Sequence, residues 1–231
     1  MNSLLSLTLL GVGASRQADI PVADLIMAGW TGRDRAAVEA HIKELGALGV
    51  AAPKRVPTFS GVGASLLTTA SAVDVVGHDS TGEVEYVLLN GDNELWVGVG
   101  SDHTDRKVEA VGVTISKQMC PKPMAPVAWA LAEIESHWDE LILRSYAVSD
   151  GKRSLYQEAS VSAMLHPRDL IELYARHNRA GFLPGTVMFG GTLPVMGGIR
   201  WTDCFSIELE DPRLERRITH TYQIRALPLE G

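Results

Sequence analysis

Three carboxylates in one stretch of the sequence could hold a metal ion. Glu83 and Glu85 stand two residues apart in a run of extended character that ends at Gly91. Side chains two apart on a strand leave the same face, so these carboxylates would lie side by side. A second extended run starts at Glu94, and a hairpin around Asn-Gly would bring the following Asp102 back beside Glu83. Oxygen ligands of this kind suit Mg²⁺, Mn²⁺ or Ca²⁺.

Each of these acidic residues also has a simpler interpretation. A half-exposed antiparallel strand places polar side chains on one solvated face, which would explain Glu83 and Glu85 without a metal. A buried pair would need a cation to stay ionised, because like charges repel. The Gly-Ser-Asp sequence that ends at Asp102 is also typical of a turn or a helix cap.

Two cations and a glycine-flanked threonine could serve an anionic substrate. Arg106 could bind a carboxylate through its forked guanidinium. Lys117 follows an apolar stretch and could anchor an enolate or transfer a proton. Gly190, Gly191 and Thr192 follow a short expected strand, where glycine lets the backbone approach a ligand and the hydroxyl adds a donor. A surface charge or a plain turn is the alternative for each.

A general base is harder to place. His103 could act as one, but a histidine in such a loop is more typical of structural hydrogen bonding. A lid that carries the base could come from residues 1–55 or 60–80, which flank the acidic strand in the sequence. The ionisable residues there are Asp34, Glu39, His41, Glu44, Asp74, His78 and Asp79. His78 is the first candidate because it is nearest to Glu83 along the chain.

The pattern of apolar residues predicts the elements that would position these groups. Strands are expected at residues 3–11, 83–91, 94–99, 187–189, 205–210 and 218–226. Helices are expected from Asp34 to Gly46, within 126–142 with Ala130, Leu131, Ile134, Trp138 and Leu141 on its apolar face, and at 167–177. The balance predicts an α+β fold dominated by strands. Pro53 and Pro57 suggest a small N-terminal α/β subdomain at 1–55 and a catalytic domain at 56–231.

Composition excludes several classes of protein. The chain has 231 residues, a net charge of −7 and no basic block, so nucleic acid is not an expected partner. Its two cysteines, Cys120 and Cys204, are too few for a disulfide framework. The first apolar run is short, lacks a preceding basic residue and alternates with Ser and Thr, so we expect a strand and a cytoplasmic protein. No apolar run approaches the roughly 20 residues of a membrane span.

The order of these motifs resembles the fumarylacetoacetase C-terminal-domain superfamily. Glu83-Val-Glu-Tyr-Val-Leu-Leu-Asn-Gly91 is similar to its Glu-x-Glu strand, and Gly100-Ser-Asp102-His-Thr-Asp-Arg106 to its Gly-Asn-Asp-x-Ser-x-Arg segment. Ser116-Lys117 resembles its Gly-Lys-Ser-Phe segment. Leu183-Pro-Gly-Thr-Val-Met-Phe-Gly-Gly-Thr192 resembles its Pro-Gly-Asp loop, and 205–210 its final strand. The resemblance covers about residues 55–225 and is that of a divergent, uncharacterised bacterial branch.

The resemblance implies a fold, a cofactor and roles for particular residues. The fold would be a mixed β-sandwich roll, in a homodimer. Glu83, Glu85 and Asp102 would hold Mg²⁺ or Mn²⁺, while Arg106, Lys117, Gly191 and Thr192 would contact a small acidic substrate. Lys117 and His78 are the candidate catalytic residues. Ser101 departs from the family's Asn, and the His–Glu pair that family hydrolases carry on a lid has no placed counterpart.

These implications lead to one expected activity and two alternatives. We expect a hydrolase that cleaves a C–C bond of a 2-oxo or 1,3-dicarbonyl acid, as fumarylacetoacetate and acylpyruvate hydrolases do. The first alternative is a lyase, either a hydratase such as 2-oxo-4-pentenoate hydratase or a decarboxylase. The second alternative is a protein that binds an acidic metabolite without turnover.

Overall fold

The computed structural model describes residues 3–11, 13–47, 52–91 and 94–230 and contains two main β-sheets. The larger sheet is formed by β1 (Ser3–Gly11), β2 (Ala14–Val22), β3 (Asp24–Gly29), β4 (Thr58–Val62), β8 (Val84–Gly91), β9 (Glu94–Ser101), β12 (Val127–Ala130) and β15 (Thr186–Thr192). Its strand order is β2-β1-β12-β9-β8-β15-β3-β4. The β1–β12 and β3–β15 pairs are parallel and the others antiparallel, so the sheet is mixed.

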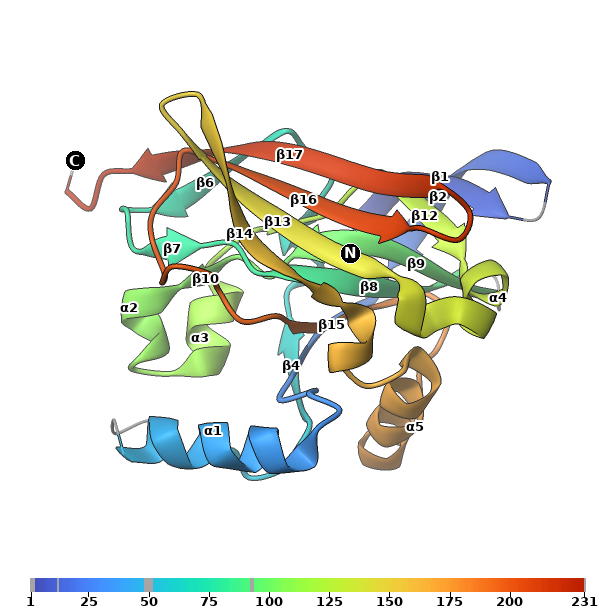
Figure 1. Cartoon of the computed structure of the whole chain (residues 1–231), viewed down its shortest axis with the longest axis horizontal. Coiled ribbons are helices and arrows are strands. Elements are labelled where there is room, and N and C mark those ends of the chain that lie inside the picture. Colours follow the sequence, from blue (N-terminus) through green and yellow to red (C-terminus); the bar gives the residue numbers. More distant parts are fainter. Residues whose placement is uncertain (1–2, 12, 48–51, 92–93, 231) are drawn as a thin grey trace.

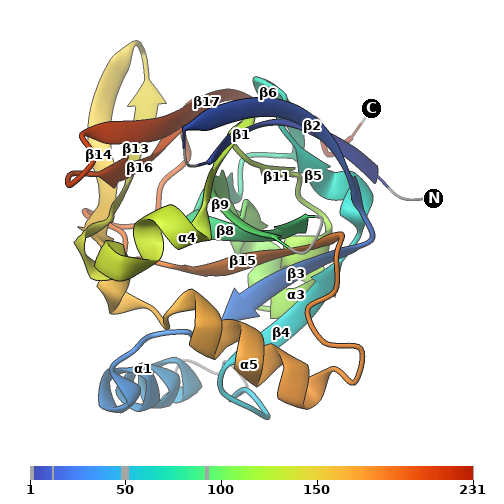
Figure 2. The same ribbon diagram turned by 90° about the vertical axis from the view of Figure 1, so that its right-hand side faces the viewer.

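The second sheet packs over the first, as Figure 1 shows. It is formed by β6 (Ala72–Val76), β13 (Ile142–Ser149), β14 (Lys152–Ser160), β16 (Cys204–Asp211) and β17 (Arg216–Leu227), in the order β14-β13-β16-β17-β6. Two short pairs, β5 (Leu67–Thr68) with β11 (Lys122–Pro123) and β7 (Ser80–Thr81) with β10 (Thr104–Asp105), complete the strands. Figure 2 shows the larger sheet curling around the β5–β11 pair.

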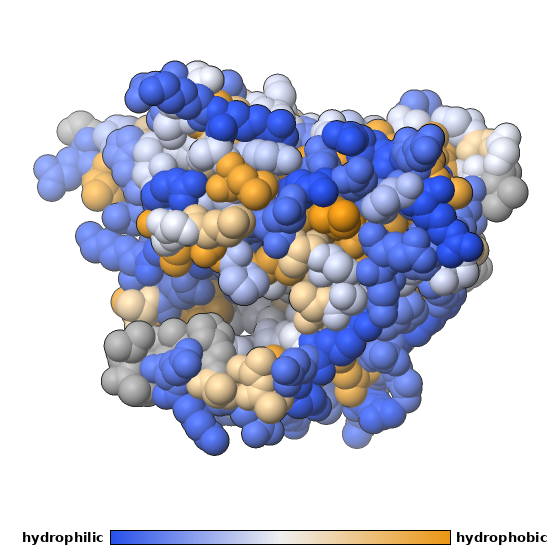
Figure 3. Space-filling view, in the orientation of Figure 1, coloured by the Kyte–Doolittle hydropathy of each residue, from blue (hydrophilic) through white to orange (hydrophobic). Residues whose placement is uncertain are grey.

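The helices lie outside these sheets (Figure 1). They are α1 (Arg35–Ala47), α2 (Arg106–Glu109), α3 (Val113–Gln118), α4 (Leu131–Ile134) and α5 (Pro167–His177), with 3₁₀ turns at Ala64–Leu66, Glu135–Glu140 and Val161–Ala163. The α+β, strand-dominated roll expected from the sequence is therefore confirmed. None of the helices in the described residues is long and apolar enough to cross a membrane. Figure 3 shows the molecule in the orientation of Figure 1, with hydrophilic residues covering most of the visible surface and apolar residues in small groups.

Alternation along β8 divides the core into two parts. Val84, Tyr86 and Leu88 belong to the core between the two sheets. Val87 and Leu89 point the other way, into the core enclosed by the curl of the larger sheet. Because side chains alternate along a strand, Glu85 shares the face of Val87 and Leu89. The carboxylate thus lies at the end of an apolar face and is shielded from water.

Most of the predicted elements are confirmed. The hairpin pairs β8 with β9 in antiparallel register, and the strands expected at 3–11, 187–189, 205–210 and 218–226 lie within β1, β15, β16 and β17. Helix α1 begins after Asp34, whose side chain accepts bonds from the N–H groups of Ala36 and Ala37 at 2.9 and 3.1 Å. Helix α5 has the expected bounds, with Pro167 in its first turn.

The helix predicted within 126–142 is wrong over its first residues. Val127–Ala130 forms strand β12, which pairs with β1 on one side and β9 on the other. Helical structure begins only at Leu131 and is interrupted at His137. The residues predicted to form the apolar face of this helix are buried in the core. At Val127–Ala130, however, pairing with two other strands overrides the helical pattern.

The first three strands share the larger sheet with the β8–β9 hairpin. Strand β1 pairs with β12, and β3 pairs with β15, so backbone hydrogen bonds join these two strands to later parts of the chain. The division of the chain near residue 55 remains a prediction.

Candidate functional site

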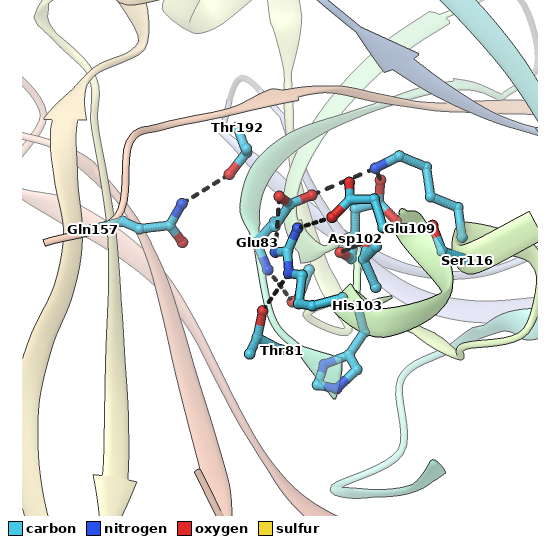
Figure 4. A network of polar contacts seen from close by, with 12 residues as sticks. Thr81, Glu83, Asp102, His103, Glu109, Ser116, Gln157 and Thr192 are labelled. Atoms are coloured by element: carbon cyan, nitrogen blue, oxygen red, sulfur yellow. Dashed lines mark hydrogen bonds and ion pairs between the residues drawn. The ribbon is translucent and has the colours of Figure 1, made fainter. Parts of the chain in front are cut away.

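The three carboxylates selected from the sequence lie together. One oxygen atom from each of Glu83, Glu85 and Asp102 lies within 4.8 Å of the other two. The register of the hairpin causes this, because Val84 pairs with Ser101 and the Asp102 N–H donates to the Glu83 carbonyl at 2.9 Å. Figure 4 shows the Glu83 and Asp102 side chains pointing toward each other.

Burial makes this cluster electrostatically unusual. Glu85 and Asp102 are 2% and 1% exposed. Burial, with the neighbouring Asp102 charge, raises the pKa of Glu85 well above its ordinary value. Burial would also raise the pKa of Asp102, but the Lys117 and Lys122 ammonium groups lower it. The two lysines therefore favour the ionised form of Asp102, whereas burial favours the protonated form of Glu85.

Two lysines approach Asp102 from different elements. Lys117, near the end of α3, contacts Asp102 Oδ2 and lies 3.5 Å from Glu83 Oε2. Lys122, in β11, lies 3.0 Å from Asp102 Oδ1 and donates to the His103 carbonyl at 2.5 Å. Lys117 was expected at this site. Lys122 was missed, because its sequence position between two prolines gives no signal of burial.

Arg106 also joins the cluster, but it pairs with side chains of the protein. Its Nη2 lies 2.9 Å from Glu83 Oε1, and its Nη1 lies 3.0 Å from Glu109 Oε2. Its Nε donates to Thr81 Oγ1 at 2.8 Å. The guanidinium thus orients Glu83 and links it to Thr81 in β7. Asp105 caps α2 by accepting a hydrogen bond from Val108 N–H.

Gly190, Gly191 and Thr192 were expected to follow the strand but form its end, in β15, and this segment contacts the cluster. Gly191 N–H donates to Glu85 Oε2 at 2.7 Å. The Thr192 hydroxyl donates to the Val84 carbonyl at 2.9 Å and accepts from Gln157 Nε2 at 2.9 Å (Figure 4). The donors expected to meet a substrate therefore bind protein acceptors in this structure. Gln157 in β14, which the sequence analysis did not select, is fully buried and donates to Thr192 at the end of β15.

The two histidines occupy different places. His103 is buried between Ser80 Oγ at 3.0 Å and the Tyr222 hydroxyl at 3.1 Å, and burial lowers its pKa to about 3. It is a neutral, structural hydrogen-bonder, as expected. His78 is exposed in the loop between β6 and β7, and its ring packs edge-on against Trp201 with centroids 4.6 Å apart. Within the described residues, His78 is not among the side chains that meet at the carboxylates.

The donor set fits a divalent metal. Three carboxylate oxygens converge, which is the chemistry that Mg²⁺ and Mn²⁺ prefer. Asp102 Oδ1 is buried, and its partner is the Lys122 ammonium at 3.0 Å rather than an aligned backbone or hydroxyl donor. A cation bound there would oppose the burial and the Asp102 charge that raise the pKa of Glu85. Glu83, Glu85 and Asp102 are thus suitable ligands.

Comparisons with known proteins agree with this fold. A family described as "Protein of unknown function (DUF2848)" matches residues 28–222. None of the curated proteins compared matches the sequence. Fumarylpyruvate hydrolase from Pseudomonas aeruginosa, solved in complex with Mn²⁺ and pyruvate, is 15% identical, with 97% of each chain covered and a TM-score of 0.62.

Two further solved structures are similar. A 2-keto-3-deoxy-D-arabinonate dehydratase complexed with magnesium and 2,5-dioxopentanoate is 15% identical, covering 92% of this chain and 77% of that one, with a TM-score of 0.64. Fumarylacetoacetate hydrolase from the psychrophilic Exiguobacterium antarcticum is 17% identical, covering 93% and 82%, with a TM-score of 0.57. The fold of the fumarylacetoacetase superfamily, predicted from the motifs, is confirmed.

Proposed function

The chain belongs to the DUF2848 family, whose model matches residues 28–222, and from this premise we propose a function. We propose that the protein is a divalent-metal-dependent enzyme acting on a small 2-oxo or 1,3-dicarbonyl acid. The observation that carries this proposal is the convergence of Glu83, Glu85 and Asp102 beside the Lys117 ammonium. A cluster of buried carboxylates with an adjacent cation suits a substrate that develops negative charge on oxygen.

The residues of the chain have separable roles in this proposal. Glu83, Glu85 and Asp102 would hold Mg²⁺ or Mn²⁺, which when bound supplies a Lewis acid for the oxo and carboxylate oxygens of the substrate. Lys117, which remains charged because Asp102 and Glu83 outweigh the effect of burial on its pKa, would donate a hydrogen bond to the developing enolate oxygen. Arg106 holds Glu83 in place, and Gly191 N–H holds Glu85.

The named ligands of two similar structures support the substrate class. Pyruvate, in the Pseudomonas aeruginosa hydrolase, and 2,5-dioxopentanoate, in the dehydratase, are both 2-oxo acids. Those structures were solved with Mn²⁺ and with magnesium. At 15% identity they share the fold with this chain, and their substrates enter only as support for the class.

We rank hydrolysis of a C–C bond first and a lyase reaction second. Hydrolysis requires a positioned base to activate water, and His78 was the first candidate. The exposed position of His78 against Trp201 favours the decarboxylase among the lyase alternatives, because decarboxylation does not need that water, whereas hydration does. Binding of an acidic metabolite without turnover is the third possibility, and Lys117 and the carboxylates would suffice for it.

A substrate panel tests the proposal. Acylpyruvates, oxaloacetate and 2-oxo-4-pentenoate should be assayed with Mg²⁺, with Mn²⁺ and with a chelator, using wild type and His78→Ala. Cleavage of acylpyruvates that is lost with the chelator is the expected result, and a loss of at least about a hundredfold in His78→Ala would identify the base. Decarboxylation or hydration alone would replace hydrolase by lyase. Metal-dependent binding without turnover would indicate the binder, and absence of metal binding would overturn the proposal.

A further inference from the structure

The Asp102 carboxylate has a lysine at each of its oxygens. Lys117 contacts Oδ2, and Lys122 lies 3.0 Å from Oδ1. The side chain of Asp102 is 1% exposed, so these two ammonium groups are its main electrostatic partners. Each Asp102 oxygen that could ligate a metal ion therefore already has an ammonium group beside it.

The two lysines differ in their freedom to move. The Lys122 side chain is fully buried, it donates to the His103 carbonyl, and its backbone pairs with β5. The Lys117 side chain is 13% exposed and extends from the last turn of a six-residue helix, α3. Another residue of α3, Ile115, is 56% exposed, so this helix lies at the surface. Lys117 can swing out of the cluster, whereas Lys122 has no route to water without unpacking its strand.

A metal ion and Lys117 compete for the same oxygens. The Lys117 ammonium contacts Asp102 Oδ2 and lies 3.5 Å from Glu83 Oε2, so it occupies the space between two of the three converging side chains. Mg²⁺ binds oxygen at about 2.0–2.1 Å and requires a near-octahedral arrangement. An ammonium group on the same oxygen would both obstruct that arrangement and repel the ion.

We propose that Lys117 is the resident cation of the metal-free site, and that Mg²⁺ or Mn²⁺ displaces it from Asp102 while Lys122 stays in place. This inference rests on the proposed function, since it takes the three carboxylates as metal ligands. Displacement leaves the Lys117 ammonium at the edge of the metal site, where it can meet a substrate oxygen. Metal loading thereby prepares the cation that the substrate needs, and Lys122 remains as a fixed counter-ion that holds Asp102.

Chemical modification of lysines tests the exchange directly. The intact protein is methylated with formaldehyde and cyanoborohydride in two conditions, one containing a chelator and the other saturating Mn²⁺. Mass spectrometry then measures the methylation of each lysine in each condition. We expect methylation of Lys117 to rise at least fivefold with Mn²⁺. Lys107, which is exposed on α2, should be methylated equally in both states, and Lys122 should stay protected in both. Unchanged protection of Lys117 while Mn²⁺ is bound would overturn the inference.

Metal affinity gives an independent measurement. Calorimetric titration of Lys117→Met with Mn²⁺ should give binding at least tenfold tighter than wild type, because the competing ammonium is gone. Lys107→Met removes the same charge from the neighbouring helix surface and should bind like wild type. Equal or weaker binding by Lys117→Met, with folding verified by circular dichroism, would overturn the exchange.

The two proposals fail in different ways. If wild type binds Mn²⁺ but Lys117 stays protected, the metal site stands and the exchange does not. If neither wild type nor Lys117→Met binds Mn²⁺ or Mg²⁺, the proposed metal-dependent function is wrong, and the exchange is wrong with it.

Discussion

Gly191 donates its backbone N–H to the Glu85 carboxylate across 2.7 Å, although 106 positions separate the two residues. The contact depends on an irregularity in β15, where the pairing with β8 shifts register between Phe189 and Thr192. Gly191 has φ of +100°, a conformation that side chains rarely adopt. A backbone feature specific to glycine thus positions one of the three candidate metal ligands.

Gly191→Ala should destabilise the protein by about 3 kcal/mol or more. A Cβ there would lie 1.9 Å from Thr31 Oγ1, in addition to the backbone strain. Chemical unfolding followed by circular dichroism measures the loss. Gly61→Ala is the matched control, because a Cβ at Gly61 meets nothing within 4 Å. Equal stability of the two variants would contradict the role given to the irregular end of β15.

Glu85→Gln should weaken Mn²⁺ binding at least about tenfold without destabilising the metal-free protein. The amide can still accept from Gly191 N–H, and it removes a buried carboxylate whose pKa is raised by burial and by Asp102. Calorimetric titration measures the affinity, and thermal unfolding in a chelator measures stability. Unchanged affinity would remove Glu85 from the ligand set.

Gln157→Leu should cost about 3 kcal/mol or more of unfolding free energy. The buried amide accepts from Val84 N–H and Ser145 Oγ, and it donates to Thr192 Oγ1 and the Leu193 carbonyl. Leucine would leave several of these groups without partners. Urea titration should show this loss, whereas Gln17→Leu, at an exposed position in β2, should stay within about 0.5 kcal/mol of wild type.

The buried His103 should make stability depend on pH. Its pKa is lowered by burial to about 3, against 6.5 for an ordinary histidine. Between these values the unfolded chain binds a proton that the folded protein does not, so the unfolding free energy falls as the pH decreases below 6.5. From pH 6.5 to 5 this amounts to about 2 kcal/mol.

Urea titrations at pH 6.5 and 5 should therefore show a smaller decrease in His103→Gln than in wild type. The exposed His177 in α5 provides the control, and His177→Gln should keep the wild-type decrease. A decrease in His103→Gln that equals the wild-type decrease would contradict this assignment.

Short sequence patterns predict only the part of the site that one hairpin forms. Alternation along β8 predicts its pairing with β9, and the register of that pairing brings Asp102 to Glu83. Lys122 and Gln157 reach the cluster through pairing of β11 with β5 and β14 with β13, which no short pattern encodes. Strand β12 was mistaken for helix for the same reason, since one of its partners, β1, lies more than a hundred residues earlier.

The pairing of Asp102 and Glu83 with cations of the chain has a consequence for how the protein is made. Zinc fingers stay unfolded until their metal arrives, because the free ligands cannot support the fold. Here Lys117, Lys122 and Arg106 already balance those carboxylates. These ion pairs allow the chain to fold before any metal ion binds. Under the proposed metal dependence, activation would then need only an ion exchange at a site that is already folded.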